Sequence, residues 1–283
     1  MIFLFLRILF NLSFAQLLKL AQARDGQILP AALVNYLVAA LLSGLGIALL
    51  RPPTPQGISL GLGVANGLTY ALSLLSMETA LQASGISITV AVLQLSVLVP
   101  TLASILIFQE RPDLGQGFGI AAALPSLWLL SGSRAVPDGP RIPLRKATAA
   151  LLSLFLITGG SGVAMKAFEV YARPTDRLAY SAALFATATL VIGIAVVREA
   201  RAWGRLAWPV GSLIGLSNLL QLEATLKALA LLPAILVFPI SSALTVSFNT
   251  LLSVWLWKER LNYRSRLGIA LAVLSAILMN WRR

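Results

Sequence analysis

Residues 110–130 read ERPDLGQGFGIAAALPSLWLL, and residues 259–279 read ERLNYRSRLGIALAVLSAILM. Both stretches begin with Glu-Arg, continue through seven residues to Gly-Ile-Ala, and end in an apolar run. The two copies are 149 positions apart (110 to 259), which is close to half of the 283 residues. This spacing predicts a chain built from two related halves.

The composition predicts a membrane protein. Hydrophobic residues make up 58% of the chain, charged residues make up 11%, and the mean hydropathy is +0.86. Soluble domains have about 45–50% apolar and about 25% charged residues. A soluble protein of this length could not cover its surface with so few charges. We expect a multi-pass protein of the cell (inner) membrane, in contact with lipid.

Ten apolar segments are long enough to cross a bilayer as helices, which takes about 20 residues each. They are delimited by hydropathy and by proline, glycine and charged residues. They lack the polar–apolar alternation of a membrane β-barrel, so the predicted fold class is all-α. The predicted spans are 2–20, 29–50, 57–80, 86–108, 114–132, 148–170, 178–197, 207–229, 233–256 and 263–281.

The spans divide into two predicted five-helix repeats, residues 1–133 and 147–283, joined by a polar linker at 134–146. Because five is an odd number, the second repeat enters the membrane from the opposite side. Inverted repeats are typical of secondary transporters, in which a central site opens to each side in turn. Three polar pairs follow the repeat at offsets of 149, 147 and 152: Ser126/Ser275, Lys19/Lys166 and Asn66/Asn218.

The chain contains no cysteine and no histidine. Their absence excludes disulfides, thiolate chemistry, His-ligated metals and a Ser-His dyad. An intramembrane Asp pair is disfavoured because every aspartate falls in a predicted connector: Asp25, Asp113, Asp138 and Asp176. We therefore predict that the protein is not an enzyme and has neither a cofactor nor a metal.

The net charge of +12 comes mainly from Lys and Arg in the connectors. In a membrane protein this pattern is explained by anchoring to anionic lipid and by topology, so we expect no nucleic-acid partner. The connectors after odd-numbered spans carry twelve Lys and Arg, and the other side with the termini carries six. By the positive-inside rule the termini would lie outside.

Charged side chains inside a bilayer are costly and indicate function by default. Seven charged residues are candidates on this ground, and four of them lie within reach of a span end. These four can either snorkel to the headgroups or serve a function: Arg7, Lys19, Glu78 and Glu169. Lys166 can pair with Glu169 three positions on, or it can bind a ligand. Lys166 follows Gly159, Gly160 and Gly162 in the same segment, and these glycines permit close approach of another helix.

Glu223 lies well inside the span 207–229, and Lys227 follows four residues later in the favourable order for an ion pair. One interpretation is that the two charges neutralise each other. The other is that Glu223 exchanges a proton or binds a cationic group. The candidate coupling residues are therefore Glu223, Lys227 and Glu78.

Uncharged polar side chains are the better candidates for a binding pocket. An amide facing lipid would leave its donors and acceptors unpaired, so these groups should face the interior. Helix-to-helix hydrogen bonding is the alternative role for each of them. The candidate substrate-binding residues are Asn66, Tyr70, Gln94, Asn218, Gln221 and Asn249, together with Lys19 and Lys166.

Three further features are predicted to be structural. Gly61, Gly63 and Gly67 serve close helix packing. Pro100 and Pro239 are expected to remove backbone hydrogen bonds and to bend their helices around a cavity. Glu110 and Glu259, each beside an arginine where a span ends, are expected to cap a helix or form an ion pair.

The layout resembles the ten-helix permeases of the drug/metabolite transporter superfamily, the EamA-like group. The resemblance is carried by NLSFAQLLK at 11–19, PTLASILIFQE at 100–110 and FNTLLSVWLWKE at 248–259. It implies inverted repeats, transport of small molecules and cytoplasmic termini, the last in conflict with the charge count. The chain departs from the family at Asn35-Tyr36, where members often have an arginine.

The expected function is transport of a small organic solute, such as a metabolite, an amino acid or a drug-like molecule, by alternating access. Proton coupling and facilitated diffusion both fit this expectation. The alternative is a membrane protein without transport activity, such as a lipid scramblase or an assembly partner. An intramembrane enzyme is disfavoured.

Overall fold

The computed structural model describes residues 2–25, 28–131, 144–199, 203–257 and 263–280. In these residues the chain forms α-helices and one short 3-10 helix, and no strand is found among them. The predicted all-α fold class is therefore confirmed for the described part of the chain. The predicted linker, 134–146, lies largely outside it.

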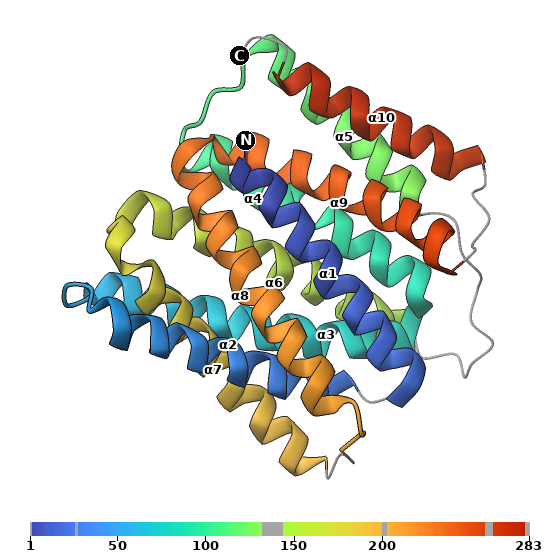
Figure 1. Ribbon diagram of the computed structural model, residues 1–283. Coiled ribbons are helices and arrows are strands. Elements are labelled where there is room, and N and C mark those ends of the chain that lie inside the picture. The colour runs from blue at the N-terminus through green and yellow to red at the C-terminus, as the bar shows by residue number, and fades with distance from the viewer. Residues whose placement is uncertain (1, 26–27, 132–143, 200–202, 258–262, 281–283) are drawn as a thin grey trace. The chain divides into compact units, whose positions relative to one another are not determined.

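The helices follow the predicted segments closely, and Figure 1 labels them along the chain. Most observed ends lie within about four residues of the prediction, which is the usual precision of boundaries read from sequence. The helices are α1 (Ile2–Asp25), α2 (Ile28–Leu50), α3 (Gly57–Leu95), α4 (Leu98–Leu106), α5 (Leu114–Ser131), α6 (Leu144–Tyr171), α7 (Arg177–Arg198), α8 (Ala207–Leu231), α9 (Ala234–Trp257) and α10 (Tyr263–Asn280), with the 3-10 turn η1 (Pro174–Asp176) before α7.

The predicted boundary between the third and fourth segments is wrong. The sequence predicts an end near residue 80 and a new helix from 86, but α3 continues without interruption to Leu95. A single glycine such as Gly85 costs a helix only about 1 kcal/mol and does not end it. The break lies before Pro100 instead, between Leu95 and Leu98. Pro100 occupies the first turn of α4, where a missing N–H costs no intrahelical bond, so the predicted loss of a hydrogen bond is wrong for Pro100.

Among the residues that the structure describes, four helical segments are long and apolar enough to cross a membrane. They are Leu29–Leu50, Gly57–Leu81, Thr148–Tyr171 and Pro174–Arg198. These segments indicate a membrane protein. The prediction of ten spans remains a prediction.

The chain folds into two compact units. The first unit contains Met1–Ala71 and Ala164–Leu231, and the second contains Leu72–Val163 and Leu232–Arg283. Neither unit coincides with a predicted repeat, because each takes helices from both halves of the sequence. The first unit holds α1, α2, α7 and α8, and the second holds α4, α5, α9 and α10.

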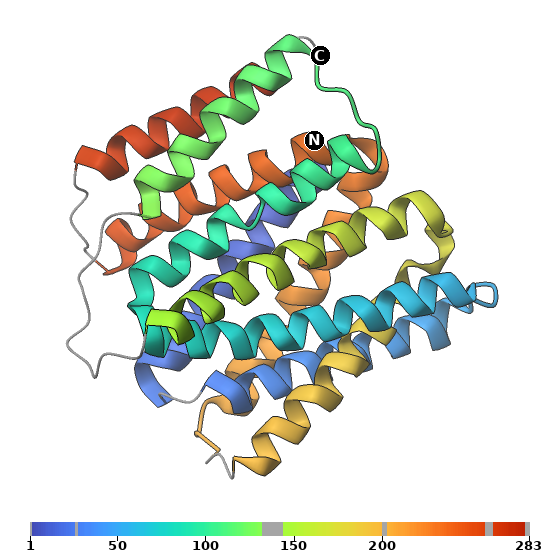
Figure 2. The same cartoon turned by 180° about the vertical axis from the view of Figure 1, so that it is seen from behind.

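In the first unit, α2 packs against α7 and α8, and α1 packs along α8 (Figures 1 and 2). The core is formed by large side chains that are fully buried, including Tyr180, Leu184 and Phe185 of α7 and Ile214 and Leu222 of α8. Burying an aliphatic or aromatic side chain contributes roughly 1.5–3 kcal/mol in water. Within lipid, close van der Waals packing takes over that role.

Glycines on α3 allow a close approach to α7. A Cβ on Gly63 would lie 2.7 Å from the carbonyl oxygen of Tyr180, and a Cβ on Gly67 would overlap the carbonyl oxygen of Leu184. A Cβ on Gly61 would meet nothing within 4 Å. The predicted packing role is therefore confirmed for Gly63 and Gly67.

The same arrangement occurs between α8 and α2. A Cβ on Gly211 would lie 2.8 Å from the carbonyl oxygen of Ala31, and a Cβ on Gly215 would lie 2.6 Å from that of Asn35. The glycines of the two crossings are 148 positions apart (63 to 211 and 67 to 215). The residues that they contact are 149 positions apart (31 to 180 and 35 to 184).

In the second unit, the two copies of the repeated element pack against each other. Helices α5 and α10 lie side by side in both views, and α9 contacts both of them as well as α4 (Figures 1 and 2). The hydroxyl of Ser275 donates to the carbonyl oxygen of Gly119 at 2.7 Å. Ser126 and Ser275, matched in the sequence, are both fully buried.

Glycines also bring α6 close to α4 within the second unit. A Cβ on Gly159 would overlap the side chain of Val99, and a Cβ on Gly162 would lie 2.8 Å from Pro100. A Cβ on Gly160 would meet nothing within 4 Å. The close approach predicted for this glycine cluster therefore rests on Gly159 and Gly162.

Candidate functional site

The structure gathers most of the predicted site residues into the first unit. Asn66 and Tyr70 come from α3, Lys166 comes from α6, and α8 contributes Asn218, Gln221, Glu223 and Lys227. Glu78 on α3 and Asn249 on α9 are half-buried and belong to the second unit. The side chains of Lys19 and Gln94 lie outside what the structure describes.

Asn66 connects α3 to α7 through a fully buried hydrogen bond. Its side-chain amide donates to the Tyr180 hydroxyl at 2.6 Å, and its own carbonyl oxygen accepts from Thr69 at 2.8 Å. Neither Asn66 nor Tyr180 exposes any surface. Of the two roles predicted for Asn66, helix-to-helix bonding is the one that the geometry shows.

Asn218 makes the corresponding connection between α8 and α2. Its amide donates to the side-chain oxygen of Asn35 at 3.2 Å, and both residues are buried. In the register set by the paired glycines, 148 positions apart, Asn218 matches Tyr70 rather than Asn66. The two asparagines therefore occupy neighbouring turns of related helices rather than one equivalent position.

Glu223 and Lys227 do not form an ion pair with each other. The hydroxyl of Ser181 on α7 donates to the Glu223 carboxylate at 2.7 Å. The Lys227 ammonium instead lies 5.3 Å from the centre of the Phe3 ring, within the range of a cation–π contact. Glu223 thus accepts a hydrogen bond from a neutral hydroxyl, while Arg177 and Lys227 interact with its carboxylate electrostatically.

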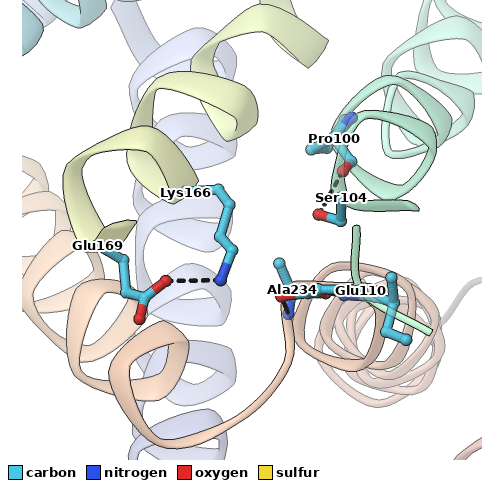
Figure 3. A network of polar contacts seen from close by, with 7 residues as sticks. Pro100, Ser104, Glu110, Lys166, Glu169 and Ala234 are labelled. Carbon is cyan, nitrogen blue, oxygen red and sulfur yellow. Dashed lines mark hydrogen bonds and ion pairs between the residues drawn. The ribbon is translucent and has the colours of Figure 1, made fainter. Parts of the chain in front are cut away.

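Lys166 pairs with Glu169 one turn later on α6, as Figure 3 shows. The ammonium nitrogen and the carboxylate oxygen are 2.5 Å apart, and the lysine side chain is only 9% exposed. Ionisable side chains inside membrane helices typically pair with one another in this way. The predicted ion pair between Lys166 and Glu169 is therefore present in the structure.

Glu110, which lies in the connector after α4, caps α9. Its two carboxylate oxygens accept from the backbone N–H groups of Ala234 at 3.0 Å and Ile235 at 2.9 Å (Figure 3). Gln109, with φ of 54°, turns the chain back, and the Glu110 N–H donates to the Ser104 carbonyl at 2.9 Å. The predicted capping role is confirmed for Glu110, whereas Glu259 lies outside the described residues.

Snorkelling was one of the two roles predicted for Arg7, and the structure shows a contact with a neighbouring helix instead. Its Nε donates to the hydroxyl of Thr225 on α8 at 2.9 Å, and Thr225 in turn donates to the Gln221 carbonyl at 2.7 Å. The guanidinium is therefore directed at a neighbouring helix. The contact between Arg7 and α8 could not be predicted from the sequence. Hydropathy shows that α1 is apolar, but it does not show which face of the helix contacts a partner.

An aromatic cluster lies beside Arg7 in the first unit. The rings of Tyr36, Tyr70 and Phe185 form a triangle with centroid distances of 6.4, 6.3 and 6.2 Å. The phenol of Tyr70 is close enough to Arg7 for an electrostatic interaction. Tyr70 was predicted as a site residue, while Tyr36 was noted only as part of the departure from the family pattern.

Comparison with known proteins gives the fold alone. No protein-family model matches the chain, and no curated protein matches it. Among solved structures, 28 chains match. One, described as "Crystal structure of protein", aligns with a TM-score of 0.76 and 16% identity over 98% of each chain. The chain is thus similar in fold to a known structure along nearly its whole length.

Proposed function

We propose that the protein is a permease of the drug/metabolite transporter type, with ten spans in two inverted five-helix repeats. It moves a small organic solute across the cytoplasmic membrane by alternating access, and Glu223 carries a coupling proton. In such proteins the substrate and the coupling ion bind at the interface of the repeats.

The observation that carries this proposal is the pair of glycine crossings in the first unit. Gly63 and Gly67 meet α7 as Gly211 and Gly215 meet α2, with offsets of 148 and 149 on the two sides of the contact. A chance likeness in apolar composition would not reproduce four backbone contacts in register. The crossings support a duplication in which each half completes the packing of the other.

Inversion of the repeats makes a direct prediction about sidedness. The chain has no cysteine, so a single introduced thiol reports its own position without background. Thr54 between α2 and α3 and Arg205 between α7 and α8 are both exposed and occupy related connectors. We expect an impermeant maleimide to label Thr54→Cys from one face of oriented vesicles and Arg205→Cys only from the other face. Labelling of both from the same face would contradict the inverted arrangement.

The proposed proton role predicts a selective loss of function. In proteoliposomes, Glu223→Gln should abolish accumulation of solute driven by a pH gradient, because an amide cannot take up the proton. It should retain solute exchange at equal pH, since the carbonyl oxygen of the introduced amide can still accept the Ser181 hydrogen bond. Asn218→Ala should lower flux while the protein stays folded, because an interhelical hydrogen bond in a membrane contributes only about 0.6 kcal/mol on average.

Glu199→Gln, an exposed change at the end of α7, is the matched control and should leave both activities intact. If Glu78→Gln lost gradient-driven accumulation and Glu223→Gln retained it, the coupling residue would be Glu78 and not Glu223. Lipid scrambling without saturable solute flux would favour the non-transport alternative.

A further inference from the structure

We infer that Arg7, Tyr36 and Tyr70 form a subsite for the carboxylate end of an aromatic organic anion. This inference rests on the proposed transport function and names the chemical class of its solute. All three residues belong to the first unit and come from α1, α2 and α3.

The first argument is the charge of Arg7. No carboxylate lies within ion-pair distance of its guanidinium among the described residues, and Nε alone has a hydrogen-bond partner there. A guanidinium carries five N–H donors, so most of them are available. An uncompensated cation on an apolar helix is costly, and an anionic ligand is the group that would compensate it.

The second argument is the phenol groups. Tyr36 is 6% exposed, and its hydroxyl makes no hydrogen bond in the described structure; the same holds for the half-buried Tyr70. No fully buried polar atom of the described residues lacks a partner. Both hydroxyl oxygens are therefore not completely buried, and both are available as donors to an anion.

The third argument is the packing of the two tyrosine rings. Phe185 is fully buried and lies 6.3 Å from the Tyr36 ring and 6.2 Å from the Tyr70 ring, so it supports both tyrosines, whose own centroids are 6.4 Å apart. Aromatic pairs prefer separations of about 4.5–7 Å in tilted or offset geometry, and a planar apolar group can extend such a cluster. Thr225 holds the Arg7 guanidinium from the side of α8, which fixes the direction of its remaining donors.

The chemistry of these groups selects the ligand. Arginine binds a carboxylate through two parallel N–H bonds, which lysine cannot do. Phenol hydroxyls donate to the same oxygens, and the rings bury the apolar body. A neutral amide of the same shape can accept hydrogen bonds but brings no negative charge, and an amine brings a positive one, so the site discriminates by charge.

Isothermal titration of the purified full chain in detergent tests this inference with three matched probes. They are phenylacetate, phenylacetamide and 2-phenylethylamine. We expect phenylacetate to bind and the other two to bind at least ~10-fold more weakly, since a charged hydrogen-bonding pair contributes about 1.5–3 kcal/mol. Arg7→Gln should weaken phenylacetate binding by ~10-fold or more, and Arg7→Lys should fall in between.

Tyr36→Phe and Tyr70→Phe keep the rings and should each weaken phenylacetate binding by roughly 2–10-fold. The exposed residues Arg198 and Tyr171 supply the matched controls Arg198→Gln and Tyr171→Phe, which should not change affinity. Equal binding of the three probes, no phenylacetate binding at millimolar concentration, or unchanged affinity in Arg7→Gln would overturn the inference.

Flux measurements separate this inference from the proposed function. Phenylacetate that binds in an Arg7-dependent way but is not transported would remove the transport proposal and leave the subsite intact. Saturable flux of a neutral or cationic solute that is unchanged in Arg7→Gln would support the transport proposal and overturn the anion subsite.

Discussion

Replacing Gly67 by alanine should destabilise the first unit by about 3 kcal/mol, the upper part of the range for overpacking. The added Cβ would overlap the carbonyl oxygen of Leu184 and lie 2.7 Å from the side chain of Thr187. A backbone oxygen cannot move to another rotamer, so α3 and α7 would have to separate. The hydrogen bond between Asn66 and Tyr180 joins the same two helices and would be lost with the separation.

Thermal unfolding of the purified protein in detergent measures this effect. Gly61→Ala is the control on the same helix, because its Cβ would meet nothing within 4 Å. That change should be neutral or stabilise by up to about 1 kcal/mol through helix propensity. Gly215→Ala, the counterpart in the other half, should destabilise about as much as Gly67→Ala. A normal melting temperature in both variants would refute the tight glycine crossings and the duplication inferred from them.

Replacing Glu110 by alanine should cost the second unit about 2–3 kcal/mol. The change removes two hydrogen bonds from a carboxylate to the first N–H groups of α9, at Ala234 and Ile235. Losing a helix cap costs about 0.5–2 kcal/mol, and the charge adds a favourable interaction with the helix dipole. Both N–H groups would be left without an acceptor in a part-buried position.

Denaturant unfolding followed by circular dichroism compares Glu110→Ala with two further variants. Glu110→Gln keeps one acceptor oxygen and should cost about half as much, roughly 1 kcal/mol. Glu199→Ala removes an exposed carboxylate at the end of α7 and should stay within about 0.5 kcal/mol of the parent. Equal stability of Glu110→Ala and the parent would show that water replaces the cap at no cost.

Much of the helix map was predictable because helix position depends on local properties of the chain. Apolar runs such as 178–197 and 207–229 became α7 and α8 with boundaries shifted by only a few residues. The exception is instructive, since the predicted spans leave a gap between residues 80 and 86 and α3 passes through it. A helix tolerates one glycine, so α3 continues past Gly85. The chain breaks instead just before Pro100, between Leu95 and Leu98.

The candidate site was predictable in residue type but not in pairing. Asn66 and Asn218 were expected inside, and both are buried, but each bonds a different partner on a different helix. Glu223 and Lys227 have the ideal spacing for an ion pair, and yet Ser181 and Phe3 are their partners. Spacing along one helix cannot show which groups a neighbouring helix presents.

The sequence by itself indicated the membrane environment, the positions of most helices and the repeated element. Composition and the length of an apolar run are properties of each segment alone. The tertiary structure alone decided that Arg7 is directed at Thr225, that Tyr36 and Tyr70 lie together, and that α5 packs on α10. The physical reason is that the sequence of a helix that is apolar on all sides does not show which of its faces will contact a neighbouring helix. Rotation is chosen by small residues that let helices approach and by the polar groups that then come within reach of each other.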